Sequence, residues 1–186
     1  MFRDLLLSRV SRFCQLSPGQ LDQLEQHYEL MLRWNKVINL TRIEDVEEVV
    51  DRHYAESLFL GSKLPSGPLR IADVGSGAGF PGLPIAVLRP ECAISLIESH
   101  KRKAVFLKEA SRALKNLSVI GQRAEEVDQI FDWVVSRAVS WEDLQRYGVK
   151  LAPNLALLCN IPPPGAKEII PIPWDVSRGT SVVVLA

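Results

Sequence analysis

A glycine-rich turn between two apolar segments constrains the fold of this chain more than any other feature. The turn follows an apolar run that begins at Leu69, and it contains Gly75, Gly77 and Gly79; a helix-length stretch and a second apolar run ending at Glu98 come after it. Glycines let a chain turn sharply and let a ligand approach bare backbone, while the first amides of the next helix point at that ligand. This order of segments predicts a βαβ unit that binds a nucleoside.

The glycines are compatible with two kinds of nucleoside site. Gly77, Gly79 and Gly82 fit the Gly-x-Gly-x-x-Gly pattern of dinucleotide sites, and Glu98 follows at a suitable distance to bind a ribose. Asp73 favours a different ligand, because its carboxylate would repel a pyrophosphate and attract the α-amino group of a sulfonium compound. Asp73, the alternating glycines and Glu98 resemble the first two motifs of S-adenosylmethionine-dependent methyltransferases. A nicotinamide or flavin site, or a turn without a ligand, is the alternative.

Length and composition indicate a globular protein outside the membrane. The chain has 186 residues, of which 47% are hydrophobic and 24% charged, and this length predicts one domain or one domain with a small extension. No apolar stretch approaches the ~20 residues of a membrane span, and the first residues do not form a signal peptide, so we expect a cytoplasmic protein. Cys14, Cys92 and Cys159 are too widely spaced for a metal knuckle, and we expect free thiols and no metal.

Helical periodicity covers the first 62 residues, and strands alternate with helices after them. Ser17 and Gln20 form a capping box before the second helix, and Asp45 is the predicted cap of a third helix that runs to Leu58. The later alternation predicts an α/β fold with a mainly parallel, twisted sheet and helices on both faces. We therefore predict a helical extension of residues 1–62 packed on a catalytic domain of residues 63–186. Predicted strands are 69–74, 93–98, 117–121, 131–136, 154–159, 168–172 and 180–185, and predicted helices in this part are 81–89, 101–115 and 141–151.

The loops after the predicted strands carry further candidate ligand groups. Ligands of such sheets bind at the carboxyl ends of the strands. After the third strand, the amide of Ala124 and the carboxylate of Glu125 can read an adenine edge; the alternative is a helix start with acids that favour its dipole. Arg137 lies at the end of the fourth strand, where its guanidinium can meet a carboxylate or a phosphate.

Basic residues concentrate in the middle third of the chain. Residues 63–123 contain ten Lys or Arg and four Asp or Glu, a net charge of +6, although the whole chain has a net charge of zero. Lys101, Arg102 and Lys103 form the centre of this basic run and are candidate contacts for an RNA backbone. The alternative is a solvated helix face.

Several segments extend the resemblance from a superfamily to a family. They are Arg33-Trp-Asn-Lys36, Asn39-Leu-Thr41, Arg52-His53, Asp73-Val-Gly-Ser-Gly-Ala-Gly-Phe-Pro-Gly82, Arg89-Pro90, Lys101-Arg-Lys-Ala-Val-Phe-Leu107 and Ser136-Arg-Ala138. Together they resemble the bacterial RsmG (GidB) family over nearly the whole chain. The resemblance implies a Rossmann-like class I methyltransferase fold, S-adenosylmethionine as cofactor, and methylation of N7 of one guanine in 16S ribosomal RNA.

The resemblance also implies roles for individual residues. Asn39, Arg52 and His53 are expected to shape the guanine pocket and the RNA approach without transferring a proton, because guanine N7 carries a free lone pair; a buried core histidine is the alternative for His53. A departure from the family lies at Cys159-Asn-Ile-Pro-Pro-Pro164, where most members have Lys-Gly. The expected cofactor-binding residues are Asp73, Gly75, Gly77, Gly79, Phe80, Glu98, Ala124, Glu125 and Arg137.

The expected partner is 16S ribosomal RNA, within the small ribosomal subunit or a precursor of it, and the protein is expected to be a monomer. Two other functions stay open. One is a methyltransferase of a small molecule or protein, which would show no salt-sensitive affinity for RNA. The other is a cofactor-binding module without turnover, suggested by the missing Lys-Gly.

Overall fold

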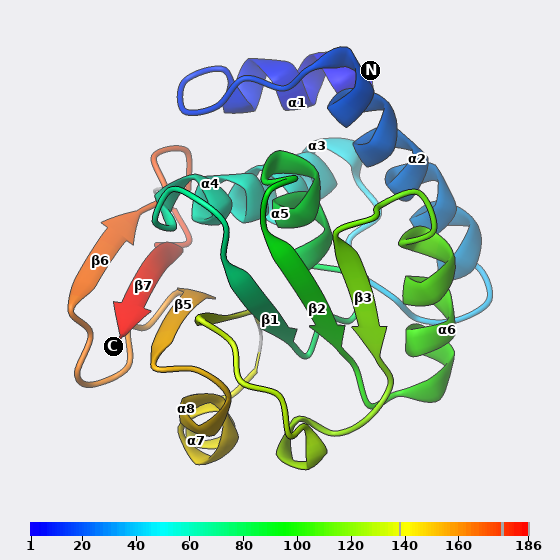
Figure 1. Cartoon of the computed structure of the whole chain (residues 1–186). Helices are drawn as coiled ribbons and strands as arrows, with labels where there is room; N and C mark the ends of the chain where they lie inside the picture. The colour runs from blue at the N-terminus through cyan, green and yellow to red at the C-terminus, as the bar shows by residue number, and fades with distance from the viewer. Residues whose placement is uncertain (138, 176, 186) are drawn as a thin grey trace.

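The centre of the molecule is a sheet with the strand order β3-β2-β1-β4-β5-β7-β6 (Figure 1). This computed structural model describes residues 1–137, 139–175 and 177–185. Ala138, the last residue of the Ser-Arg-Ala motif, and Ala186, the end of the predicted catalytic domain, lie outside the described residues. β1 to β5 are parallel, and β7 runs antiparallel between β5 and β6. The strands are β1 (Arg70–Val74), β2 (Ala93–Ile97), β3 (Leu117–Ile120), β4 (Trp133–Arg137), β5 (Asn154–Cys159), β6 (Glu168–Pro171) and β7 (Ser181–Leu185).

Helical segments cover both faces of the sheet and bury a hydrophobic cluster on each face. Val134 and Val135 of β4 belong to different clusters, because successive side chains of a strand point to opposite faces. The mainly parallel sheet with two covered faces confirms the predicted fold class. The helical segments are α1 (Phe2–Val10), α2 (Pro18–Asn35), α3 (Val46–Val49), the π-helix η1 (Val50–Ala55), α4 (Glu56–Lys63), α5 (Gly82–Leu88), α6 (Lys101–Ala110), the 3-10 helix η2 (Ala124–Glu126), α7 (Trp141–Asp143), the π-helix η3 (Leu144–Gly148) and α8 (Val149–Leu151).

The N-terminal helices begin at the residues that the capping signals predict. The hydroxyl of Ser17 accepts a hydrogen bond from the Gln20 amide, and the Gln20 side chain accepts one from the Ser17 amide. Asp45 caps α3 by accepting a hydrogen bond of 2.9 Å from the Glu48 amide. α3, η1 and α4 follow without interruption, so the predicted third helix contains a stretch of wider π-helical turns. Such turns are frequent at functional sites.

The N-terminal helices share a hydrophobic cluster with the sheet. Leu24 of α2 is fully buried in the same cluster as Ile71 of β1. Arg89, which follows α5, donates hydrogen bonds to the carbonyls of Gly61, Pro65 and Gly67 and so fixes the linker before β1. Figure 1 shows α1 and α2 along the outside of this helical layer. The division into an extension and a catalytic domain stays a prediction.

The strand limits agree with the predicted ones to within two residues, but the third helix continues five residues past its predicted end at Leu58, to Lys63, and another helix is shorter than predicted. The helix predicted for 101–115 ends at Ala110. Beyond it, the Leu114 amide bonds to the Ser111 carbonyl, three residues back, and this tighter turn brings the buried Leu114 into the larger hydrophobic cluster. No helix in the described part of the chain is both long and apolar enough to span a bilayer.

Candidate functional site

The glycine-rich turn lies at the carboxyl end of β1, beside β4, where the strand order reverses and where open α/β sheets bind their ligands. Gly75 and Gly77 have φ angles of 74° and 57°, in the left-handed region that favours glycine. A Cβ on Gly75 would lie 2.6 Å from Cγ2 of Val139. A Cβ on Gly77 would meet no atom nearer than the Gly75 carbonyl oxygen, at 3.8 Å, so the turn leaves open space at Gly77.

Two carboxylates fix the turn through its amides. Oδ2 of Asp73 accepts a hydrogen bond of 2.9 Å from the Gly82 amide. Oε2 of Glu98 accepts one of 2.9 Å from the Gly77 amide, and Oε1 accepts one of 2.8 Å from the His100 amide. Both acids are buried, and burial raises the pKa of Asp73 to about 7. The Asp73 side chain is buried beneath the turn and lines none of the three cavities described next, and its attraction of an α-amino group stays a prediction.

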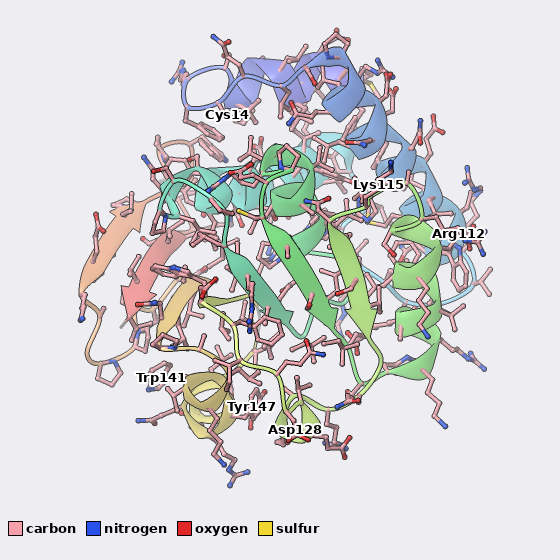
Figure 2. The ribbon with its side chains drawn as sticks, in the orientation of Figure 1. Cys14, Arg112, Lys115, Asp128, Trp141 and Tyr147 are labelled. Atoms are coloured by element: carbon pink, nitrogen blue, oxygen red, sulfur yellow. The ribbon has the colours of Figure 1, made fainter. Side chains whose placement is uncertain are left out.

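Three adjoining cavities open at this edge of the sheet, and Val139 lines all of them. The smallest, which we name the Glu125 cavity, has a volume of about 190 Å³. Glu98 and the predicted pair of Ala124 and Glu125 line it. Tyr147 of η3 lies beside the η2 segment and completes the wall (Figure 2). The loops after β2 and β3 thus meet as predicted from their position in the sheet.

The second cavity, the His53 cavity, has a volume of about 280 Å³ and shares Gly75 and Glu98 with the first. Phe80 and Gly77 line it from the glycine turn, and Arg137 lines it from the end of β4. The cavities therefore bring together the predicted cofactor residues, except for Asp73 and Gly79, which are buried and line neither cavity.

His53 is a buried, neutral side chain in this second cavity. Its ring stacks on Phe80 with the centroids 4.7 Å apart, and Nε2 makes a hydrogen bond of 2.8 Å with Oγ1 of Thr41. Nδ1 has no hydrogen-bond partner among the described residues. Burial lowers the pKa of His53 to about 3, and the charges of Arg137 and Arg52 add to this effect. A group with so low a pKa is a poor proton acceptor at neutral pH.

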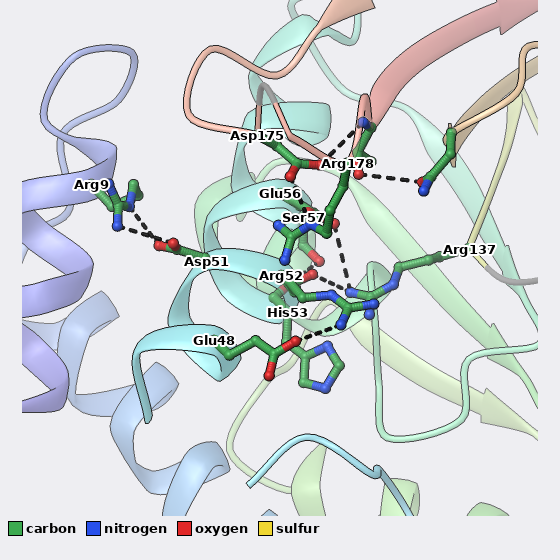
Figure 3. A network of polar contacts seen from close by, with 12 residues as sticks. Arg9, Glu48, Asp51, Arg52, His53, Glu56, Ser57, Arg137, Asp175 and Arg178 are labelled. Carbon is green, nitrogen blue, oxygen red and sulfur yellow. Dashed lines mark hydrogen bonds and ion pairs between the residues drawn. The ribbon is translucent and has the colours of Figure 1, made fainter. Parts of the chain in front are cut away.

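The third cavity, the Glu56 cavity, has a volume of about 410 Å³. Arg52, Glu56, Arg137 and Arg178 form its charged wall (Figure 3), and Trp141 contributes to an apolar wall. Arg137 also lines the His53 cavity, so this residue lies at the boundary of the two. Four residues of the segment where the family resemblance leads us to expect Lys-Gly line the Glu56 cavity as well: Cys159, Asn160, Ile161 and Pro163.

The charges around Glu56 were not predicted from the sequence. Oε1 of Glu56 lies 3.4 Å from Nη2 of Arg178, and Oε2 lies 4.0 Å from Nη1 of Arg137. The Arg137 guanidinium also donates a hydrogen bond to the Arg52 carbonyl (Figure 3). Burial raises the pKa of Glu56 to about 7. The sequence feature that could have pointed to Glu56 is its position as an acid inside the apolar run that follows His53.

The remaining predicted residues are divided between two places. Asn39 is exposed and lines a separate cavity of about 320 Å³ with Arg102 and Lys103, so it does not share a cavity with Arg52 or His53. Lys103 also lines the His53 cavity, and Lys101 is exposed at the start of α6. Arg112 and Lys115 lie beyond the other end of α6 (Figure 2). The centre of the basic run, Lys101–Lys103, is therefore at the end of α6 near the site, and Arg112 and Lys115 are at the far end.

His27 connects α2 to the glycine turn. Nε2 lies 3.0 Å from the Ala78 carbonyl oxygen, and Nδ1 lies 2.8 Å from the Tyr54 hydroxyl. Because a carbonyl only accepts, Nε2 carries the proton and Nδ1 accepts from Tyr54. Burial lowers the pKa of His27 to about 4. Trp34, further along α2, packs against Phe106 at the edge of the larger hydrophobic cluster.

Residues 20–155 match the family described as rRNA small subunit methyltransferase G (GidB). Three similar proteins carry the name Ribosomal RNA small subunit methyltransferase G. The protein of Halorhodospira halophila is 40% identical over 164 residues, which are 85% of this chain and 78% of that protein. The protein of Roseiflexus castenholzii is 37% identical over 157 residues, 80% of this chain and 67% of that protein. The protein of Nitrosospira multiformis is 45% identical over 138 residues, 72% of this chain and 61% of that protein.

Solved structures with the same fold include Aeropyrum pernix fibrillarin in complex with natively bound S-adenosyl-L-methionine. Its TM-score is 0.56 at 14% identity, over 73% of this chain and 75% of that chain. A SAM dependent methyltransferase from Aquifex aeolicus has a TM-score of 0.54 at 13% identity, over 75% of this chain and 93% of that chain. At these identities the likeness shows the fold alone. The family match and the relatives confirm the family predicted from the sequence, and the chain belongs to the rRNA small subunit methyltransferase G family.

Proposed function

We propose that this chain transfers the methyl group of S-adenosylmethionine to N7 of a guanine in 16S ribosomal RNA. Membership in the family supports the reaction class, the cofactor and an RNA substrate. The choice of guanine N7 rests on the resemblance of the sequence motifs. The structural observation that supports this proposal is a row of three adjoining cavities at the carboxyl ends of the strands. It extends from Glu125 past the glycine turn to Glu56.

The cavity residues fit the cofactor. Glu98 uses two of its acceptor positions for amides, and an ionised carboxylate has about four, so it can also accept hydrogen bonds from ribose hydroxyls. Ala124 and Glu125 would hold the adenine, and the open space at Gly77 would admit the chain that carries the sulfonium. Arg137 would meet the cofactor's carboxylate. Bound S-adenosylmethionine supplies a methyl group on a positively charged sulfur, and its transfer leaves the positive charge on the methylated guanine.

The protein residues need only to position the guanine. N7 carries a lone pair and no proton, so no general base is required, and the low pKa of His53 agrees with a role in shaping the cavity. Holding two reactants in line can lower a barrier by up to ~7 to 11 kcal/mol in favourable cases. His53 and Phe80 would form a rigid wall for this purpose, because their rings stack and both are buried.

The RNA would approach across the start of α6. Lys101, Arg102 and Lys103 would contact phosphates there, and Asn39 would line the same approach. The proposed substrate is 16S ribosomal RNA within the small subunit or a precursor of it, where ribosomal proteins can add contacts beyond the phosphates. The proposed enzyme acts as a monomer in the cytoplasm.

Small ribosomal subunits from cells that lack the gene test this function. Incubation with the purified chain and S-adenosylmethionine should produce N7-methylguanosine in 16S ribosomal RNA, detected by mass spectrometry of nucleosides and mapped by cleavage at the methylated position. A methyl group on another base or another guanine atom would contradict the proposal. Cofactor binding without methylation of any RNA would favour a binding module without turnover.

A further inference from the structure

We propose that Glu56 recognises the Watson–Crick edge of the target guanine and thereby selects guanine over the other bases. This inference rests on the proposed function, because it places the target base in the Glu56 cavity. It adds a specificity-determining residue outside the motifs that indicated the reaction.

The Glu56 carboxylate has acceptor capacity that the described residues do not use. The residue is 3% exposed, and its Oε1 accepts one long hydrogen bond, of 3.4 Å, from Arg178. Oε2 lies 4.0 Å from the nearest Arg137 nitrogen, beyond hydrogen-bond distance. A buried carboxylate is costly unless donors satisfy it. Further donors from a ligand in the cavity would therefore be stabilising.

Guanine supplies the donors that such a carboxylate needs. Its N1–H and its N2 amino group are adjacent and parallel, so they can bond to both oxygens of one carboxylate. Adenine has a bare acceptor at N1, cytosine has one amino group beside an acceptor, and uracil has one N–H between two carbonyls. Each of these places an acceptor against a carboxylate, so Glu56 would repel the wrong bases as well as attract the right one.

The arrangement of the cavities suits attack by N7. Glu56 lines only its own cavity, whereas Arg137 lines both that cavity and the His53 cavity beside the glycine turn. Because N7 is on a different edge of guanine from N1 and N2, a base held by Glu56 leaves N7 free to face the glycine turn. Trp141 and Pro163 offer apolar walls for the base faces. The carboxylate would also stabilise the positive charge that the ring gains on methylation.

The ionisation of Glu56 should make guanine binding depend on pH. Burial raises its pKa to about 7, against the opposing effect of Arg137 and Arg178; Asp175 raises it further, and Arg52 lowers it slightly. Only the ionised carboxylate accepts both guanine donors. Guanine binding should therefore strengthen as the pH rises through about 7.

The test compares guanosine and inosine monophosphate, because inosine lacks the N2 amino group. Binding to the chain saturated with S-adenosylhomocysteine is measured by calorimetry for the wild type, Glu56→Gln and Glu56→Asp. Glu47→Gln is the control, since Glu47 is an exposed acid on the preceding helix. The same four proteins are assayed on small subunits for kcat/KM between pH 6 and 8. Glu56→Asp keeps the charge beside Arg137 and Arg178, so it stays informative if Glu56→Gln fails to fold.

The wild type and Glu47→Gln should prefer guanosine monophosphate by on the order of 10-fold or more. Their kcat/KM should rise through about pH 7. Both Glu56 variants should lose most of this preference and at least about tenfold in kcat/KM, with the affinity for S-adenosylhomocysteine unchanged. Equal affinity of the wild type for the two nucleotides, no binding of either, or a Glu56 variant that keeps the preference would overturn the inference. A wild type that methylates no ribosomal RNA would instead contradict the proposed function.

Discussion

Replacing His27 by glutamine should remove a defined part of the acid sensitivity of this protein. Burial lowers the pKa of His27 from 6.5 to about 4 in the folded chain. As the pH falls below 6.5, the unfolded chain binds a proton that the folded chain does not bind, so the free energy of unfolding decreases. The stabilisation is complete above pH 6.5 and is lost progressively as the pH falls toward 4. At 1.36 kcal/mol per pKa unit, the total loss is on the order of 3 kcal/mol.

The measurable quantity is the slope of the unfolding free energy against pH. Near pH 5.5 the unfolded chain carries this proton in about nine of ten molecules and the folded chain in very few, which gives a slope of about 1 kcal/mol per pH unit. Urea denaturation of the wild type and His27→Gln between pH 5 and 6 should show slopes that differ by this amount. Glutamine keeps a donor for the Ala78 carbonyl and an acceptor for the Tyr54 hydroxyl, so the fold should persist.

A matched variant separates titration from lost contacts. Tyr54→Phe removes the hydrogen bond to Nδ1 but leaves the imidazole buried, so it should lower the stability and keep most of the slope. Other groups with shifted pKa values whose causes do not include His27, such as Asp73 and Glu56, are common to all three proteins and cancel in the comparison. An unchanged slope in His27→Gln would show that His27 is not held neutral in the folded protein.

Three further substitutions test the proposed site, and a proteolysis experiment tests the N-terminal helices. Gly77→Val should abolish calorimetric binding of S-adenosylhomocysteine, because its side chain would enter the open space of the turn and its φ of 57° disfavours β-branched residues; retained binding would place the ligand elsewhere. Arg137→Ala should lower cofactor affinity or turnover by on the order of 10- to 100-fold. Lys103→Ala should leave cofactor affinity intact and reduce by about one the slope of log affinity for RNA against log salt concentration. If Arg137→Ala kept full activity and Lys103→Ala abolished cofactor binding, the assignment of Arg137 to the cofactor and Lys103 to the RNA would be refuted. Limited proteolysis should release no folded, active fragment that starts near Leu64, because the N-terminal helices and the sheet share one hydrophobic cluster. Recovery of such a fragment would show that the sheet domain folds and works without these helices.

Local sequence signals were sufficient for the glycine turn, the strands and the helix caps. Periodicity, turn glycines and capping residues act over a few positions, so Ser17 and Asp45 marked helix starts correctly. Contacts between distant residues were not accessible in this way. Glu56 and Arg178 are 122 positions apart, and only the folded sheet brings them to one cavity. The sequence also could not show on which side of the glycine turn a side chain lies. Asp73, for example, is buried beneath the turn. The assignment of residues to cofactor and RNA stays a prediction.

The hydrophobic cluster shared by the N-terminal helices and the sheet has a consequence for protein synthesis. The ribosome makes α1, α2 and α4 before any strand of the sheet exists, and the fully buried faces of these helices, including Leu6, Leu24 and Leu58, have no sheet to cover them at that stage. At about 5–20 residues per second, Arg137 at the end of β4 follows the end of α4 after roughly 4–15 s. Nascent chains therefore pass through an interval in which these helices expose apolar surface to chaperones. The proposed cofactor site can form only after that interval, when β4 has left the ribosome.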